Sequence, residues 1–273
     1  MNAELLIMFT LGCDRAYLYA HPEREPTPDE TRRYDDALAR RATGVPAQYI
    51  TGHQEFWGLD LIVSPAVLIP RPETEHVVEA VLEIVSSADS VLSQDQRPRT
   101  GVSAPHNLRI VDVGTGSGAI ALALAKELPQ AEIHATDISA EALEVARANA
   151  ARHELASRIE FHRADLLDGF SPASFDFVVS NPPYVGESEE DSVQLEVRKF
   201  EPRNAVFAGP TGLEVIERLI PPAQVVLKPG GWLIFEISGT IAAGVRRLLE
   251  NWTAVRLTND LQGIARVAIA QRE

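Results

Sequence analysis

Cysteine is nearly absent from this sequence of 273 residues, and long apolar runs are missing altogether. The single cysteine, Cys13, can form neither a disulfide within the chain nor a multi-cysteine zinc site, which fits a reducing compartment. No apolar stretch approaches the roughly 18 residues that a membrane span needs. The apolar start contains Glu4 and no basic segment, so it predicts a helix rather than a signal peptide. We therefore expect a cytoplasmic protein with no membrane partner and no metal site.

Basic residues are also scarce relative to acidic ones. Lys and Arg number 25 against 39 Asp and Glu, which gives a net charge of −14. Tight non-specific binding to nucleic acid needs a Lys and Arg surface that neutralises phosphates, so this balance argues against a nucleic-acid partner. The hydrophobic share of 45% and the charged share of 23% lie close to the globular average, which excludes wholesale disorder.

Three segments differ in their patterns. Residues 1–52 predict a small helical domain, with a capping box that starts a helix after Thr27. Residues 53–70 predict two short strands with a turn near Gly58, which together form a β-hairpin linker. Residues 71–273 predict the main domain.

The main domain opens with a helix from His76 to about Val85, followed by a polar segment, 86–107, that predicts a surface loop. Strands and helices then alternate. We expect strands at 108–113, 131–136, 158–163, 175–180, 232–237, 255–258 and 266–270, and helices at 119–128, 140–153, 213–227 and 241–252. Such alternation predicts an α/β fold with a mostly parallel sheet, and the last two strands should pair antiparallel at one edge.

A glycine-rich turn joins the first of these strands to its helix. Its residues are Gly114, Thr115, Gly116, Ser117 and Gly118. Glycines allow a tight turn and a close approach of the backbone to a ligand at a helix N-terminus. The G-x-G-x-G spacing differs from the G-x-G-x-x-G of dinucleotide folds, and a tight turn without a ligand is the alternative interpretation.

Acidic residues follow the strands at the same sheet edge. Asp137 ends the second strand, where a carboxylate can accept hydrogen bonds from ribose hydroxyls. Asp165 ends the third strand, with Leu166 beside it, and Asp112 precedes the glycines, where it either braces the loop or binds a cationic group. Three acids suit a cofactor with cationic and hydroxyl groups better than a pyrophosphate, which disfavours NAD.

The fourth strand runs into Asn181-Pro182-Pro183-Tyr184. Two prolines make the strand tip stiff, because both φ angles are fixed. Asn181 adds a carbonyl acceptor, and Tyr184 adds a flat aromatic face. Together they can hold a planar NH₂ group, with two acceptors for its hydrogens and a ring stacked on its plane.

These motifs resemble the HemK/PrmC family, the protein-(glutamine-N5) methyltransferases that act on peptide chain release factors. The matching segments are 40–52 (RRxxGxPxQYIxG), 55–59 (EFWGL), 68–75 (LIPRPETE), 114–121, 180–185, 201–202 (EP) and 260–266 (DxxGxxR). Three features depart from the family: a shorter amino-terminal segment, the long 86–107 loop, and Ser238-Gly239-Thr240 after Glu236.

The resemblance implies a class I, Rossmann-like methyltransferase sheet of seven strands, with residues 1–52 recognising the substrate and 71–273 binding S-adenosyl-L-methionine. It implies a monomer that methylates the glutamine of the Gly-Gly-Gln motif in class I release factors. The implied cofactor-binding residues are Gly114, Thr115, Gly116, Ser117, Gly118, Asp137, Asp165, Leu166 and Asn181, and the implied substrate-binding residues are Asn181, Pro182, Pro183 and Tyr184.

The implied catalytic residues are Asn181, Pro182 and Tyr184. Because an amide nitrogen is a weak nucleophile and is not deprotonated near pH 7, we expect catalysis mainly by orientation. The Asn181 side-chain oxygen and the Pro182 carbonyl would accept the amide hydrogens, while Tyr184 stacks on the amide plane. The histidines are expected to be ordinary surface or core residues.

Other functions remain open at this point. An adenine-N6 methyltransferase would need the same two acceptors and stacking ring, although the charge of −14 argues against it. A glutamine methyltransferase that acts on a ribosomal protein is a closer competitor. A cofactor-binding protein without activity is a third alternative, disfavoured by the intact Asn181 and glycine loop.

Overall fold

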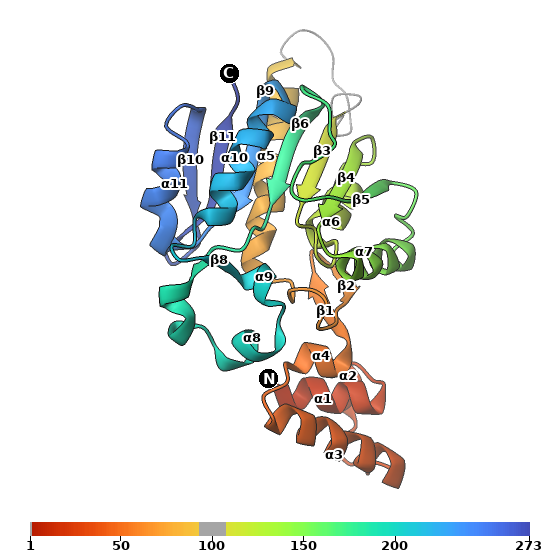
Figure 1. The fold of residues 1–273 in the computed structure, drawn as a ribbon. Helices are drawn as coiled ribbons and strands as arrows, with labels where there is room; N and C mark the ends of the chain where they lie inside the picture. Colours follow the sequence, from red (N-terminus) through yellow and green to blue (C-terminus); the bar gives the residue numbers. More distant parts are fainter. Residues whose placement is uncertain (1, 93–107) are drawn as a thin grey trace.

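Four short helices form the amino-terminal part of the computed structural model, which describes residues 2–92 and 108–273 (Figure 1). They are α1 (Asn2–Leu11), α2 (Arg15–Ala20), α3 (Pro28–Ala42) and α4 (Ala47–Thr51). The predicted capping box is present, since the Thr27 hydroxyl accepts from the Glu30 N–H and the Glu30 carboxylate accepts from the Thr27 N–H. The small core of these helices contains Leu6, Ala37 and Ile50.

A β-hairpin connects these helices to the sheet. Strand β1 (His53–Phe56) pairs antiparallel with β2 (Leu59–Ile62), and Trp57 and Gly58 make the turn with positive φ angles. The hairpin is shorter than the predicted 53–70, because residues 63–71 form an irregular loop before the 3₁₀ helix η1 (Pro72–Thr74). Prolines at positions 65 and 70 have no backbone N–H for a strand ladder there.

The predicted seven-stranded sheet is confirmed (Figure 1). Its strands are β3 (Arg109–Val113), β4 (Glu132–Asp137), β5 (Ile159–Arg163), β6 (Phe175–Ser180), β9 (Leu227–Glu236), β10 (Thr253–Asn259) and β11 (Ala265–Gln271). Their order is β10-β11-β9-β6-β3-β4-β5, and only β11 runs antiparallel to its two neighbours. Strands β4 and β5 join the sheet on one side of β3, and β6 joins on the other side. The order of the strands therefore reverses between β3 and β6, and ligands bind at such a point in open α/β sheets.

Helices cover both faces of the sheet. One face carries α5 (Glu75–Leu92), α6 (Ala119–Glu127) and α7 (Ala140–Arg152), and the other carries α10 (Glu214–Val226), η3 (Gly239–Ile241) and α11 (Ala242–Leu248). Two buried apolar clusters fill the spaces between the sheet and these helices. No helix in the described ranges is long and apolar enough to cross a membrane.

The expected end of the first main-domain helix was wrong. Helix α5 continues through residues 86–92, where a surface loop was expected, and the rest of that loop, 93–107, lies outside the described residues. Residues 86–92 contain neither glycine nor proline, so nothing in them ends a helix. The Ser87 hydroxyl donates to the Glu83 carbonyl one turn earlier, as serines within helices do.

Residues 185–209 form several short elements that no sequence pattern indicated. They are β7 (Val185–Gly186), η2 (Glu187–Ser192), α8 (Leu195–Phe200), α9 (Arg203–Val206) and β8 (Phe207–Gly209). Ion pairs join Glu190 to Arg203 and Asp191 to Arg198. This segment, coloured teal to cyan in Figure 1, leaves the tip of β6 and returns to α10.

A fully buried asparagine ties the hairpin to the glycine loop. The Asn149 amide on α7 donates to the carbonyls of Ile62 and Ser117 at 3.0 and 2.9 Å, and its oxygen accepts from the Ile62 N–H at 2.7 Å. These three bonds satisfy backbone groups of two segments that are far apart in the sequence.

We predict that Asn149→Ala lowers the free energy of unfolding by about 3 kcal/mol, because it leaves buried backbone groups unpaired. Urea denaturation followed by circular dichroism measures this change. The control is Glu144→Ala, which removes an exposed side chain from the same helix and should change stability by less than about 0.5 kcal/mol. Equal stability of the two variants would show that the three hydrogen bonds of Asn149 do not stabilise the fold.

Candidate active site

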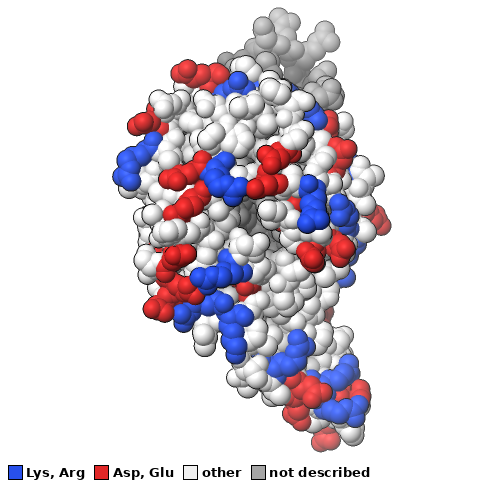
Figure 2. All heavy atoms as spheres, viewed as in Figure 1, with Lys and Arg blue, Asp and Glu red and all other residues white. Residues whose placement is uncertain are grey.

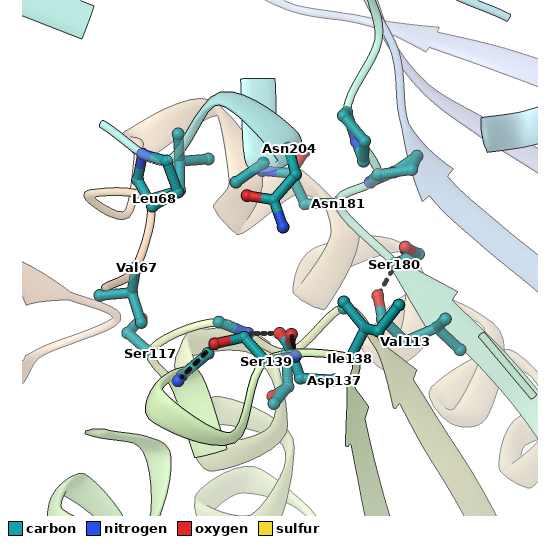
Figure 3. A pocket seen from close by; sticks show the side chains of 18 of the residues that line it. Val67, Leu68, Val113, Ser117, Asp137, Ile138, Ser139, Ser180, Asn181 and Asn204 are labelled. Atoms are coloured by element: carbon teal, nitrogen blue, oxygen red, sulfur yellow. Dashed lines mark hydrogen bonds between the residues drawn. The ribbon is translucent and has the colours of Figure 1, made fainter. Parts of the chain in front are cut away.

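A cavity of about 560 Å³ opens at the carboxyl ends of β3, β4 and β6 (Figure 3). Ten of the predicted site residues line it: Gly114, Thr115, Gly116, Ser117, Asp137, Asp165, Leu166, Asn181, Pro182 and Pro183. Gly118 and Tyr184 are not among the lining residues. The sheet topology therefore brings both sequence motifs to a single cavity.

The three glycines of the loop all have positive φ angles, but they serve different purposes. A Cβ at Gly118 would lie 3.0 Å from the Leu122 side chain and 3.3 Å from that of Ala146, so this glycine permits close helix packing. A Cβ at Gly114 or Gly116 would meet no heavy atom within 4 Å. Those two positions leave open space beside the cavity.

Asp137 is fixed by the backbone at the end of β4. Its carboxylate accepts hydrogen bonds from the N–H groups of Gly116 and Ser139, each at 2.9 Å. Burial raises the pKa of the Asp137 carboxyl. Since a carboxylate offers about four acceptor positions, two backbone donors leave capacity for hydroxyl groups in the cavity.

Asp165 and Leu166 line the side of the cavity next to β4. The Asp165 carboxylate pairs with the Arg218 guanidinium on α10 at 2.6 Å, which offsets its negative charge. Leu166 has a positive φ of 53°, and its carbonyl accepts from the Thr136 hydroxyl at 2.9 Å. The backbone at Leu166 is therefore held in a conformation that non-glycine residues rarely adopt.

Asn181 presents its amide at the tip of β6. Its Nδ2 donates to the Thr74 hydroxyl at 3.0 Å, so the orientation of the amide is set by a residue from η1. The preceding Ser180 hydroxyl donates to the Val113 carbonyl at 2.7 Å and joins the two strand tips. The Asn181 oxygen is consequently left as the acceptor of this side chain.

Tyr184 points away from the cavity lining. Its hydroxyl donates to the Glu236 carboxylate at 2.8 Å, and its ring packs against the apolar cluster beneath α10 and α11. Burial raises the pKa of Glu236, while the Thr74 and Tyr184 hydroxyls partly offset this effect. The expected stacking of Tyr184 on the substrate stays a prediction, and in this structure the ring anchors the loop.

Thr74, Glu236 and Glu201 were not predicted as site residues. Thr74 lies in the matched LIPRPETE segment, and Glu236 is an acid at the end of a buried strand, which was the available signal. The Glu201 side chain is 1% exposed, accepts from the Ile69 N–H at 3.1 Å and pairs with the Arg71 guanidinium. Glu201 thereby fastens segment 185–209 to the 63–71 loop across the mouth of the cavity.

Asp112 lies beneath the glycine loop and does not line the cavity. Its carboxylate accepts from the Thr115 hydroxyl at 2.6 Å and from the Ala121 N–H at 3.2 Å. Of its two expected roles, these contacts support bracing of the loop. Burial raises the pKa of Asp112 to about 7.

Comparison with known proteins identifies the family. The family model for the PrmC N-terminal domain matches residues 1–52, and the model for the methyltransferase small domain matches residues 100–199. A release factor glutamine methyltransferase from Koribacter versatilis is 52% identical over the whole of this chain and 91% of its own length. The chain belongs to the release factor glutamine methyltransferase family. The predicted resemblance is therefore confirmed.

Two further relatives with the same name are similar over most of the chain. The protein from Chlorobaculum tepidum is 41% identical, with 97% of this chain and 88% of that one covered. The protein from Moorella thermoacetica is 40% identical, with 100% and 91% covered.

Solved structures share the fold of this family. The human METTL16 catalytic domain in complex with a MAT2A 3′UTR hairpin matches with a TM-score of 0.57 and 17% identity, covering 89% of this chain and 81% of that one. The METTL16 N-terminal domain in complex with SAH gives a TM-score of 0.51 at 19% identity, covering 86% and 82%. The predicted class I methyltransferase fold is thus confirmed.

The raised pKa of Asp112 leads to a prediction about pH. The folded protein holds a proton on Asp112 up to about pH 7, whereas the unfolded chain releases it near pH 3.8. Its contribution therefore lowers stability as pH rises through this window. We predict that Asp112→Asn makes the slope of the free energy of unfolding against pH more positive between pH 4 and pH 7 than in the unmodified protein, in urea titrations. An unchanged slope would show that the pKa of Asp112 is not raised in the folded protein.

Proposed function

We propose that this protein transfers a methyl group from S-adenosyl-L-methionine to the side-chain amide nitrogen, N5, of the glutamine in the Gly-Gly-Gln motif of class I release factors. Membership of the release factor glutamine methyltransferase family supports this activity. The observation that carries it is the Asn181 amide at the cavity, whose Nδ2 is already bound to Thr74 and whose oxygen is left as an acceptor.

The cavity fits the proposed cofactor in size and in chemistry. Its volume of about 560 Å³ lies within the range of small-molecule sites. The open space at Gly114 and Gly116 would admit the cofactor against the backbone, and Asp137 would accept hydrogen bonds from its ribose hydroxyls. When bound, S-adenosyl-L-methionine supplies an electrophilic methyl group on a sulfonium. The other residues that would contact the cofactor are Thr115, Ser117, Asp165, Leu166 and Asn181.

The chain's own residues would act on the substrate amide by orientation. The Asn181 oxygen and the Pro182 carbonyl would accept the two amide hydrogens, which directs the nitrogen and stabilises positive charge that grows on it. Pro182 and Pro183 line the cavity and stiffen the strand tip, since their φ angles are fixed. No strong base is needed in this scheme, because the nitrogen loses its proton to water only after it is methylated.

Other features support a protein substrate. Acidic and basic side chains alternate over the face of the molecule in Figure 2 rather than forming one basic surface. With the net charge of −14, this distribution favours release factors over nucleic acid as partners. We further propose that residues 1–52 contact the release factor, that residues 71–273 carry the chemistry, and that the enzyme works as a cytoplasmic monomer.

Mass spectrometry of a purified class I release factor after incubation with the enzyme and S-adenosyl-L-methionine tests this function. We expect one added methyl group, placed by fragmentation on the Gly-Gly-Gln glutamine. The matched control is a release factor with glutamate at that position, which has no amide nitrogen and should gain nothing. Methylation of adenine in oligonucleotides or of a ribosomal protein, with none on the release factor, would overturn the proposal.

We predict that Asn181→Ala lowers kcat by about 100-fold, because it removes one of two acceptors for the amide hydrogens. Single-turnover assays with a saturating release factor measure this change. Asn204→Ala is the matched control, since Asn204 also places an amide at the cavity without a comparable bond to η1 (Figure 3). If both variants lost activity equally, general polarity of the cavity rather than Asn181 would explain the rate.

We also predict that Thr74→Val lowers kcat by about 10- to 100-fold with little change in KM for the release factor. Valine has a similar shape but cannot accept the Asn181 Nδ2–H, so the amide is no longer held in one orientation. Thr74→Ser keeps the hydroxyl and should restore most of the rate. A serine variant as slow as the valine variant would show that the hydroxyl is not the positioning group.

A further inference from the structure

The sheet has one region that helices leave open. Within the described ranges the chain passes from β5 to β6 without a helix, and β5 is an edge strand of the sheet. On the face that carries α10 and α11, the ring of Phe170 lies against His134 and His162 at centroid distances of 5.8 and 5.0 Å. This region lies on the side of the sheet opposite β10, at the right in Figure 1.

Three potential metal ligands gather on this face. In the parallel register His134 of β4 lies opposite Glu160 of β5, and His162 follows two residues later. Side chains two residues apart on a strand share a face, so all three point to the same side of the sheet. His134 is buried, His162 is half-buried and Glu160 is exposed.

The three ligand atoms have the spacing of a metal site. His134 Nδ1 lies 3.0 Å from His162 Nε2 and 3.1 Å from the Glu160 carboxylate, which in turn lies 3.7 Å from His162 Nε2. A tetrahedral Zn²⁺ ion with bonds of about 2.0–2.1 Å sets its ligand atoms about 3.3 Å apart. An ion between the three atoms therefore needs only small side-chain shifts.

A fourth residue orients one of the ligands. Nε2 of His134, the nitrogen that faces away from the cluster, lies 2.8 Å from the Glu132 carboxylate and 3.2 Å from the Arg109 guanidinium. In the tautomer in which Nε2 donates to Glu132, Nδ1 carries the lone pair that a metal ion would use. Metal-binding histidines usually donate their second N–H to a carboxylate in this way. The Arg109 guanidinium also pairs with Glu132 at 2.9 Å and fixes that carboxylate.

In this tautomer the Nδ1 lone pair of His134 faces His162 Nε2 and the Glu160 carboxylate, and either a proton on His162 Nε2 or a metal cation can lie between them. The three ligand atoms come from two adjacent strands, so the backbone pairing of β4 and β5 already holds them together. Imidazole nitrogens with one carboxylate select Zn²⁺ and similar transition metals rather than Mg²⁺ or Ca²⁺.

We propose that His134, Glu160 and His162 bind one divalent transition-metal ion of the zinc class, with solvent completing its coordination. This site is separate from the cofactor cavity, since none of the three lines it. It departs from the expectation that the histidines are ordinary residues and that the protein has no metal site. The bound ion would tie edge strand β5 to β4, the strand that ends at Asp137.

Titration of the untagged, metal-free chain with Zn²⁺ in a calorimeter tests the proposal. We expect one ion per chain with a dissociation constant in the micromolar range or below, and a rise in melting temperature at excess Zn²⁺. Co²⁺ in place of Zn²⁺ should give the visible absorption of a tetrahedral site. Mg²⁺ should bind no better than to the controls.

Variants assign the binding to these residues. His162→Gln and Glu160→Gln change side chains at or near the surface and should each abolish the high-affinity site, whereas Glu132→Gln should weaken it about 10- to 100-fold. His76→Gln is the matched control, because it breaks another histidine–carboxylate pair, with Glu79, outside the cluster. Absence of Zn²⁺ binding to the unmodified chain, or equal binding by the His162 variant, would leave a hydrogen-bonded histidine pair and overturn the proposal.

Discussion

The hydrogen bond from Asn181 to Thr74 decides which end of the Asn181 amide is left for a ligand. An asparagine can present either a donor or an acceptor, and an amide substrate needs acceptors for its hydrogens. Because Thr74 binds the nitrogen end, the oxygen end is available at the cavity. Thr74 lies next to the buried Glu236, which also holds the Tyr184 hydroxyl. Both ends of the Asn181–Tyr184 motif are thus fixed by hydrogen bonds, one to Thr74 in the cavity wall and one to the buried Glu236, and this preorganisation is what an orientation mechanism requires.

The fold supplies that arrangement through buried polar side chains that join distant segments. Asn149 holds the hairpin against the glycine loop, Glu201 holds segment 185–209 against the 63–71 loop, and Ser180 joins the tips of β3 and β6. Each of these groups lies in or near the apolar interior, where an unpaired polar group is unfavourable by about 1–3 kcal/mol. Alternative loop positions would leave these groups unpaired, so the same bonds that close the cavity also make its shape specific.

Sequence patterns were sufficient for features that depend on short stretches of chain. The glycine loop, the Asn181–Tyr184 motif, the capping box and the alternation of strands and helices all follow from local residue order. The direction of Tyr184 and the partners Thr74 and Glu236 could not be predicted, because they lie 52 to 107 residues from the groups they bind. The elements of 185–209 were missed for a related reason: they are too short for a periodic pattern and depend on contacts with other segments.

Three acids near the cavity have raised pKa values but different roles. Burial raises the pKa of Asp112, Asp137 and Glu236 alike. Asp137 meets the cavity and accepts from two backbone N–H groups, which leaves it able to receive hydroxyl groups, whereas Asp112 and Glu236 lie behind the surface and bind side chains of the protein itself. The latter two hold functional loops at the expense of stability, since a buried carboxylate is unfavourable unless fully paired. Their effect is therefore to position the site rather than to stabilise the fold.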